Sequence, residues 1–255
     1  MGQNVYAHAQ LTPSFLMPHF GISRMFDDQV ALRMQNQALP QIDLGYQFTN
    51  GVQMAYGFSL PRTARSQNEW RFGIGGKLMW RRGGYRLLSI EQLMNLSKNT
   101  LFDLAGSYAP GFGVDVGTQF IHTFNRALSL QFGAAMTDIG DTNFGSYADP
   151  QKSNAKFGVA LKSDMKALRV VLSYDYQHAF DNVDWRLKQH LGFEFALPLL
   201  SIYGGLDELY PTYGFGVDVW LVKITALSYA EELSSVYGQD PERRYMLRVS
   251  VKLGM

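Results

Sequence analysis

The residues whose types could do chemistry lie closest together in the stretch YDYQHAFDNVDW, at positions 174–185. It contains Asp175, His178, Asp181 and Asp184. An imidazole among carboxylates could hold a metal ion, or could activate water in a protease at the rim of a barrel. Polar loops often contain the same residues without such a role, and no zinc-type spacing accompanies them. We therefore predict neither a metal site nor a catalytic site here.

The histidines and serines do not form a hydrolase pattern. A phospholipase built on a barrel needs a serine nucleophile beside a histidine, commonly as His-x-Ser on one strand. None of the five histidines, at positions 8, 19, 122, 178 and 190, is followed two residues later by serine. The sequence also contains no phosphate-binding loop or paired-carboxylate motif. It therefore predicts a protein that is not an enzyme and uses no cofactor, and an outer-membrane hydrolase is the least favoured alternative.

A second group of charged residues is spread along the chain at alternating positions. They are predicted to share the polar side of successive strands and to line the inside of a barrel: Asp43, Arg71, Lys77, Asp115, Lys156, Arg169, Asp175, Lys188, Glu194, Asp218, Arg248 and Lys252. Both signs are present, so internal ion pairs that close a narrow barrel account for them. The alternative is a polar channel with a slight preference for anions.

The segment GFGVDVGTQF, residues 111–120, shows how strands would position these charges. Apolar residues such as Phe112 and Val116 occupy even positions, whereas Asp115, Gln119 and glycines occupy odd ones. Successive side chains of a β-strand point to opposite faces. The pattern predicts a strand whose apolar face meets lipid and whose polar face carries Asp115 inside the barrel.

The same alternation recurs along most of the chain after residue 40. It predicts about twelve antiparallel strands, many close to the length of about 9–11 residues that crosses a membrane when tilted. Asn50-Gly51 predicts a two-residue hairpin between strands at 41–49 and 52–60. Short connections alternate with long ones, as in outer-membrane barrels. Within the longest connection, residues 87–104 are predicted to be helical.

Composition supports an all-β membrane protein. The 255 residues include 14% aromatic residues and 25 glycines, which suits a large barrel, and the net charge of +1 gives no sign of nucleic-acid binding. The chain has no cysteine, and its longest apolar stretch, residues 193–206, contains Glu194 and Pro198 and is too short for a spanning helix. A soluble β-sandwich would also alternate, but its polar face would be rich in Lys, Glu and Thr rather than in Gly, Gln and Ser. We therefore expect a transmembrane antiparallel β-barrel.

Three glycine-rich stretches carry a resemblance to a known family. They are GIGGKLMWRRGGYR at 73–86, GFGVDVGTQFIHTFNRALSLQFGAAMTDIG at 111–140, and QHLGFEFALPLLSIYGGLDELYPTYGFGVDVWLVKITALSYAEEL at 189–233. They resemble the superfamily of outer-membrane barrels typified by long-chain fatty-acid transporters, and above all its shorter relatives, which include secretion-machine shuttle barrels. The resemblance implies a barrel, usually of fourteen strands, in the outer membrane of a Gram-negative cell.

The resemblance also implies an N-terminal hatch folded inside the barrel. We expect residues 1–40 to form this hatch or plug and residues 41–255 to form the barrel. Residues 1–40 lack the sustained alternation of the later strands, and Asp27 or Asp28 is expected to pair with a Lys or Arg inside the barrel. The family has an Asn-Pro-Ala segment before the first strand, which corresponds to Asn36 and the two residues after it, with Gln in place of Pro.

Two functions follow from these expectations. The first is uptake or binding of hydrophobic or amphipathic small molecules by a porin-like barrel, with membrane lipid and a hydrophobic ligand or detergent as partners. The alternative is a scaffold that does not transport and that docks a protein partner of the envelope or of a secretion machine. The first residues, MGQNVYAHAQ, have no basic end and no apolar run and do not form a secretion signal, so the protein is either cytoplasmic or has had its signal removed. The barrel pattern of the other residues favours removal, and we expect the outer membrane as its location.

Overall fold

The structure is a computed structural model that describes residues 4–35, 41–60, 67–89, 106–145 and 148–251. The strands are β1 (Asn4–Leu11), β2 (Ser14–Met17), β3 (Phe20–Gln35), β4 (Gln41–Ser59), β5 (Asn68–Ser89), β6 (Ala109–Thr123), β7 (Leu128–Thr137), β8 (Asn154–Met165), β9 (Leu168–Tyr176), β10 (Gln189–Ala196), β11 (Leu200–Asp207), β12 (Tyr210–Val219), β13 (Val222–Glu232) and β14 (Pro241–Val251). A single 3-10 turn, η1 (Trp185–Lys188), interrupts the strands of these described ranges. Within the same ranges, no helix has the length and apolar character needed to cross a membrane.

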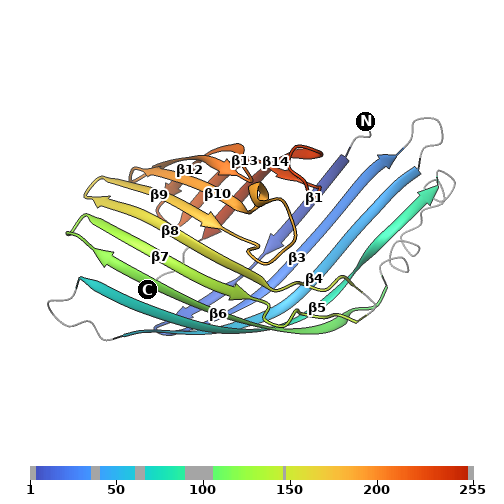
Figure 1. The fold of residues 1–255 in the computed structure, drawn as a ribbon, viewed down its shortest axis with the longest axis horizontal. Helices are drawn as coiled ribbons and strands as arrows, with labels where there is room; N and C mark the ends of the chain where they lie inside the picture. The colour runs from blue at the N-terminus through green and yellow to red at the C-terminus, as the bar shows by residue number, and fades with distance from the viewer. Residues whose placement is uncertain (1–3, 36–40, 61–66, 90–105, 146–147, 252–255) are drawn as a thin grey trace. The chain divides into compact units, whose positions relative to one another are not determined.

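The strands form one fourteen-stranded antiparallel sheet, as the alternation predicts. Consecutive strands are hydrogen-bonded neighbours from β3 to β14, while β1 and β2 both pair with β3 (Figure 1). β1 and β14 are the ends of this order, and no pairing joins them in the described part of the chain. Contacts divide the chain into two compact units. The first comprises 1–57, 73–116 and 137–153, and the second comprises 58–72, 117–136 and 154–255.

The expectation for residues 1–40 is corrected by the structure. Instead of a separate segment, residues 4–35 form β1, β2 and β3, and β3 pairs with β4 from Phe20 to Gln35. The physical reason is that a strand in a sheet satisfies its backbone groups through its neighbours even where side-chain alternation is imperfect. A hatch is therefore not shown. These three strands raise the number above the predicted twelve.

The predicted hairpin at Asn50-Gly51 is also wrong, because β4 runs through both residues. Asn50 pairs with Phe26 and Gly51 with Met25 in the β3–β4 register. Gly51 serves a close approach instead of a turn, since a β-carbon there would stand 3.0 Å from the Leu78 carbonyl oxygen of β5. The two strands predicted at 41–49 and 52–60 are thus one.

The second unit exposes a row of large apolar side chains on its later strands. Phe193 of β10, Phe215 of β12 and Leu247 of β14 are 49%, 58% and 71% exposed. The register continues the row across strands, because Phe215 pairs with Ile202 of β11 and Leu247 with Ala226 of β13. The positions next to Phe193, Phe215 and Leu247 are polar or glycine, except for Met246 of β14. This alternation gives the unit one apolar and one polar face.

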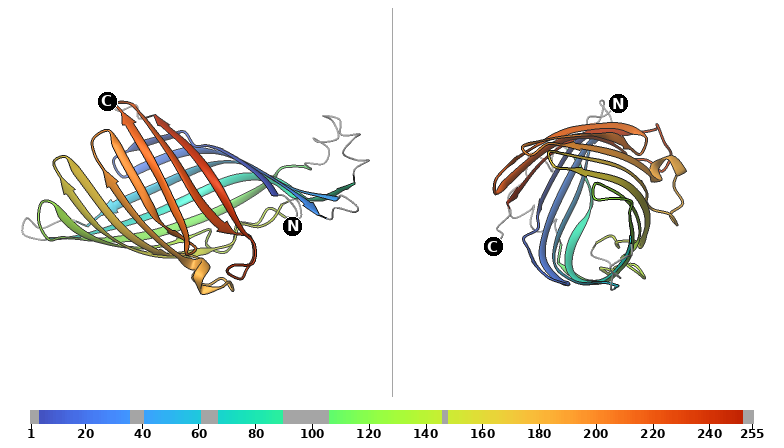
Figure 2. Two further views of the ribbon diagram at one scale, coloured as in Figure 1. Left: turned by 90° about the horizontal axis from the view of Figure 1, so that it is seen from above. Right: turned by 90° about the vertical axis from the view of Figure 1, so that its left-hand side faces the viewer.

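The connection before β10 folds against the turn between β13 and β14 within the second unit. η1 lies beside this turn in Figure 2. Ser235 accepts a hydrogen bond at its carbonyl oxygen from the backbone amide of Asp184 at 3.0 Å, and the Asp184 side chain accepts one from the amide of Arg186 at 3.0 Å. Asp184 thus caps η1 and joins the two connections. Of the helix predicted at 87–104, residues 87–89 belong to β5 and residues 90–105 lie outside the described residues.

Candidate functional site

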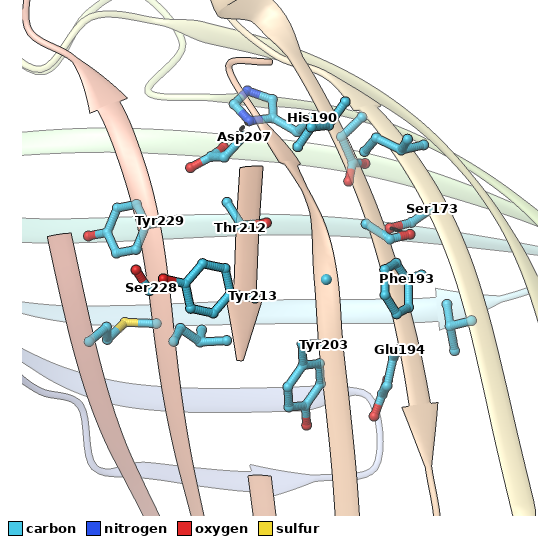
Figure 3. Close-up of a pocket in the computed structure, with 18 residues that line it drawn as sticks. Ser173, His190, Phe193, Glu194, Tyr203, Asp207, Thr212, Tyr213, Ser228 and Tyr229 are labelled. Atoms are coloured by element: carbon cyan, nitrogen blue, oxygen red, sulfur yellow. Dashed lines mark hydrogen bonds and ion pairs between the residues drawn. The ribbon is translucent and has the colours of Figure 1, made fainter. Parts of the chain in front are cut away.

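A pocket lies over β9 to β14 in the second unit (Figure 3). Its volume is about 550 Å³, within the range of roughly 300–1,000 Å³ typical of small-molecule sites. Asp175, His190, Glu194 and Asp207 supply its charged groups, Ser173, Tyr203, Thr212 and Tyr229 supply hydroxyls, and Val171, Leu227 and Met246 supply apolar surface. Polar and apolar groups therefore face the same space.

His190 is the central titratable residue of this pocket. Its Nδ1 hydrogen-bonds to Asp207 Oδ1 of β11, with which it is paired across the two strands. On its other side, Asp175 of β9 is its cross-strand partner. His190 Nε2 is buried and has no hydrogen-bond partner among the described residues. A buried ring nitrogen without a partner costs free energy, so Nε2 marks a position where a ligand hydroxyl or a water would bind.

The opposite end of the pocket is closed by an ion pair. Arg169 of β9 donates to Glu194 Oε1 of β10 at 2.7 Å. Lys223 Nζ lies 5.8 Å from the centre of the Tyr203 ring, in a cation–π contact that orients this aromatic wall. The carboxylate at this end is thus paired with Arg169, whose Nε is buried without a hydrogen-bond partner among the described residues, as His190 Nε2 is at the other end.

A second polar cluster belongs to the first unit, where the connection between β7 and β8 folds onto the sheet. We call residues 138–145 and 148–153 of this connection the strap. Lys77 Nζ of β5 lies 2.9 Å from Asp138 Oδ2 of the strap and 2.9 Å from Asp115 Oδ1 of β6. The Asp138 amide donates to Asp115 Oδ1 at 2.8 Å, and Thr142 Oγ1 donates to Asp138 Oδ1 at 2.8 Å. Lys77 and Asp138 are both buried, so each depends on the other for charge compensation.

Arg81 of β5 makes a second set of contacts with the strap. It donates to Gln151 Oε1 at 2.8 Å and to the Asp149 carbonyl oxygen at 3.3 Å, while its Nε donates to Thr49 Oγ1 of β4 at 3.0 Å. Its guanidinium also lies 4.4 Å from the centre of the Phe144 ring. A planar cation with several fixed donors can hold a loop in this manner.

The strap contact is the best-packed place in the described structure. The largest fully buried side chains are Phe144, Thr142 and Asp138 of the strap with Met79 and Thr49 of the sheet. Strap and sheet therefore share one small core, closed at its base by Ser153. The Ser153 amide donates to Asp141 Oδ1 at 2.7 Å and lowers the pKa of that carboxyl below its usual value.

The glycines of β6 make room for the strap. A β-carbon at Gly113 would stand 2.6 Å from Thr142 Oγ1 and 2.8 Å from Asp138 Oδ1, and one at Gly111 would overlap the Phe144 ring. The sequence places these glycines on the polar row of the strand together with Asp115. In the structure, the space above these two glycines is filled by side chains of the strap.

The structure brings together two pairs of the residues predicted to line a barrel. Lys77 lies beside Asp115, and Arg169 beside Glu194. Others are placed on strands without joining these pairs: Asp43 pairs across strands with Arg33, Arg71 forms an ion pair with Glu69, Lys156 lies on β8, Asp218 pairs across strands with Lys223, and Arg248 pairs with Thr225. Lys252 lies outside the described residues. Whether these residues line an interior stays a prediction.

The remaining predicted site residues belong to the connection before β10 and to β3, or lie outside the described residues. Lys188 is buried and donates to the carbonyl oxygens of Ala179 and Asp181 in the connection before β10, and its place inside a barrel stays a prediction. Asp27 Oδ2 lies 3.3 Å from His8 Nε2 of β1, and its carboxylate also interacts electrostatically with Arg81 of β5. Asp28 pairs across strands with Phe48, and Asn36 lies outside the described residues.

The acidic stretch at 174–185 does not converge on one point. His178 Nδ1 lies 2.7 Å from Asp181 Oδ2, but Asp175 belongs to the pocket beside His190, and Asp184 caps η1. No group of three His, Asp or Glu side chains among the described residues is arranged to hold a metal ion.

Sequence reasoning missed the His190–Asp207 pair and the strap. His190 was noted only for lacking a serine two residues later, and Asp207 follows a glycine pair at a strand end. The alternation of polar and apolar residues offers one signal for this pair, because His190 and Asp207 both lie in the polar rows of neighbouring strands. Comparison of the chain with models of known protein families and with curated proteins found no match.

Proposed function

We propose that the sheet closes into a β-barrel that spans the outer membrane, with its apolar face toward lipid and its polar face inside. The observation that carries this proposal is the row of exposed apolar side chains across paired strands, exemplified by Phe193, Phe215 and Leu247. In water such a row would be costly, because each large apolar side chain contributes about 1.5–3 kcal/mol when buried. Lipid would cover it without loss of the backbone hydrogen bonds.

The barrel binds or takes up an amphipathic small molecule, and the pocket around His190 is its binding site. The pocket supports this function because Leu227 and Met246 offer apolar surface in the same pocket as His190, whose Nε2 has no partner among the described residues. Uptake of hydrophobic molecules is also what the resemblance to fatty-acid transporters implies.

Labelling of single cysteines tests the membrane proposal, since the chain has no cysteine of its own. Leu247→Cys and Val249→Cys would carry an NBD fluorophore on the apolar row, and Met246→Cys and Ser250→Cys on the polar row. In vesicles with brominated lipid, we expect quenching at 247 and 249 and little at 246 and 250. Equal quenching at all four positions would rule out the two-faced membrane strand.

A matched pair of substitutions tests the binding site. Leu227→Trp would fill the pocket, whereas Leu247→Trp adds the same bulk on the apolar face of the adjacent strand. We expect the first change to reduce binding of a dansyl-labelled medium-chain alcohol to protein in vesicles and the second to leave binding unchanged. Equal binding by both variants and the parent would show that the pocket is not the site.

A scaffold that docks an envelope partner is the second candidate. The observation in its favour is that residues 4–35 are strands of the sheet and do not show the expected hatch, on which regulated transport would depend. Isolation of the protein from membranes of its native cell discriminates between the two. A stoichiometric protein partner would support the scaffold, and its absence together with ligand binding would support uptake.

A further inference from the structure

We propose that the strap is a latched gate that covers the polar face of β4–β6, and that Lys77 is the latch. This inference rests on the proposed function and extends it, because it assigns control of access through the barrel to residues 138–145 and 148–153. In the proposed barrel the polar face of these strands lines the interior. The strap packs on that face and would therefore lie across the path of a molecule that passes through the barrel.

The anchoring of the strap is electrostatic at one end and apolar at the centre. Asp138 is bound by Lys77 Nζ at 2.9 Å and receives a hydrogen bond from Gln151 Nε2 at 2.7 Å. Phe144, which is 1% exposed, packs with Met79 and Ala109. Lys77 is thus the cation that contacts this buried carboxylate, which also accepts hydrogen bonds from Thr142 and Gln151.

The connection is built to stay folded on the sheet instead of extending away from it. Thr142 and Gln151 exchange backbone hydrogen bonds at 2.8 and 2.9 Å, which turns the strap into a narrow loop. The Ile139 amide donates to the Val114 carbonyl oxygen of β6 at 2.9 Å. A loop that is closed on itself and joined to β6 can move as one body about its base.

The strength of the latch depends on the ion pair between the buried side chains of Lys77 and Asp138. Removing one partner of a buried ion pair leaves an uncompensated charge, which costs more than removing both. Lys77→Met would strand Asp138, which is 2% exposed, and should release the strap. Lys77→Met with Asp138→Asn leaves no charge at position 138 and keeps a side chain that can accept a hydrogen bond from Thr142. Asp115 also loses Lys77, but its side chain is 33% exposed and can be solvated, so the strap should return toward its parent position.

Spin labels on the strap and sheet report release without any assumption about a pore. Asn143→Cys on the strap and Ile74→Cys on β5 are both exposed and lie in the first unit. We expect a narrow distance distribution by double electron–electron resonance in the parent, a broad one in Lys77→Met, and a narrower one again in the double variant. Lys162→Met is the matched control, because Lys162 pairs with Asp164 at an exposed site on β8.

Conductance in planar bilayers tests whether the strap controls access. We expect the conductance of Lys77→Met to rise several-fold over that of the parent and of Lys162→Met. Gln151→Leu removes strap contacts to Asp138 and Arg81 without leaving a lysine unpaired, and should give a smaller rise in conductance. This variant replaces Lys77→Met in the experiment if Lys77→Met does not fold.

An unchanged distance distribution in both Lys77→Met and Gln151→Leu would overturn the latch. Release of the strap with unchanged conductance would overturn its role as a gate. Failure of the membrane proposal would appear separately, as equal lipid quenching at positions 246, 247, 249 and 250.

Discussion

Gly113 of β6 lies directly beneath Thr142 of the strap, so that a β-carbon on the glycine would stand 2.6 Å from Thr142 Oγ1. The nearest strap atoms are themselves held by Lys77 and Asp138 and cannot yield freely. We therefore expect Gly113→Ala to displace the strap and to lower the free energy of unfolding by about 1–3 kcal/mol, the usual cost of overpacking.

Gly75→Ala is the control for this change. Gly75 shares the polar face of the first unit, but a β-carbon there would meet its nearest atom, the Met54 carbonyl oxygen, at 3.5 Å. Urea unfolding of both variants in lipid vesicles measures the difference. Equal stability of the two variants would show that the strap does not depend on the space above Gly113.

The two faces of β6 should respond oppositely to charge. Val116 lies on the apolar row and is 41% exposed, whereas Gln119 lies on the polar row and donates to Gln131 at 3.2 Å. Val116→Arg is expected to cost about 2–4 kcal/mol at the membrane midplane, and Gln119→Arg much less. Unfolding in bilayers measures both, and a Val116→Arg variant as stable as the parent would contradict the lipid-facing assignment.

The alternation of apolar and polar residues was enough to predict the sheet, because a strand with one apolar face has an apolar residue at every second position. The same alternation contains a signal against the hairpin that was predicted at Asn50-Gly51. Apolar residues occupy even positions before and after it, as Phe48 and Met54 show. A two-residue hairpin would pair Phe48 with Gln53 and place both side chains on one face of the sheet. Because apolar residues instead stay at even positions through the whole segment, the pattern indicates one continuous strand.

Other features of the fold and of the site depend on contacts between residues far apart in the sequence. The alternation of apolar and polar residues does not predict such contacts. The Lys77–Asp138 pair joins positions 61 residues apart, and nothing local in either sequence identifies the partner. The first strands were missed because β3 carries Asp27 and Asp28 in its middle, which breaks the alternation, although pairing with β4 still satisfies its backbone. His190 and Asp207 come together through register, which depends on the turn between their strands.

The turn between β11 and β12 uses residues that such a turn normally avoids. Glu208 and Leu209 have φ angles of 52° and 65°, the pair of positive values that a type I′ turn requires and that Asn-Gly usually supplies. A left-handed conformation costs a residue with a β-carbon about 1–2 kcal/mol. We expect Leu209→Gly to be more stable than Leu209→Ala by about 1 kcal/mol, because both lose the same packing and only glycine relieves the backbone. Equal unfolding midpoints for the two variants would contradict this account.

Glu208 also makes this turn sensitive to pH. Burial raises the pKa of Glu208 above its usual value, although its Oε2 accepts a hydrogen bond from the Glu232 amide at 2.7 Å. Because the folded-state pKa is the higher one, the carboxyl supports folding fully below its unfolded pKa of about 4.3 and loses that contribution as the pH rises through the folded value. Glu208→Gln keeps an acceptor for the amide and removes the ionisation.

Unfolding of the parent and of Glu208→Gln across the acid range measures this contribution. We expect the variant to gain stability relative to the parent as the pH rises through the folded pKa, and to keep a constant advantage above it. Glu208→Ala should show the same pH trend with a smaller advantage, because it leaves the Glu232 amide without its acceptor. A difference between parent and Glu208→Gln that does not change with pH would show that the ionisation of Glu208 does not oppose folding.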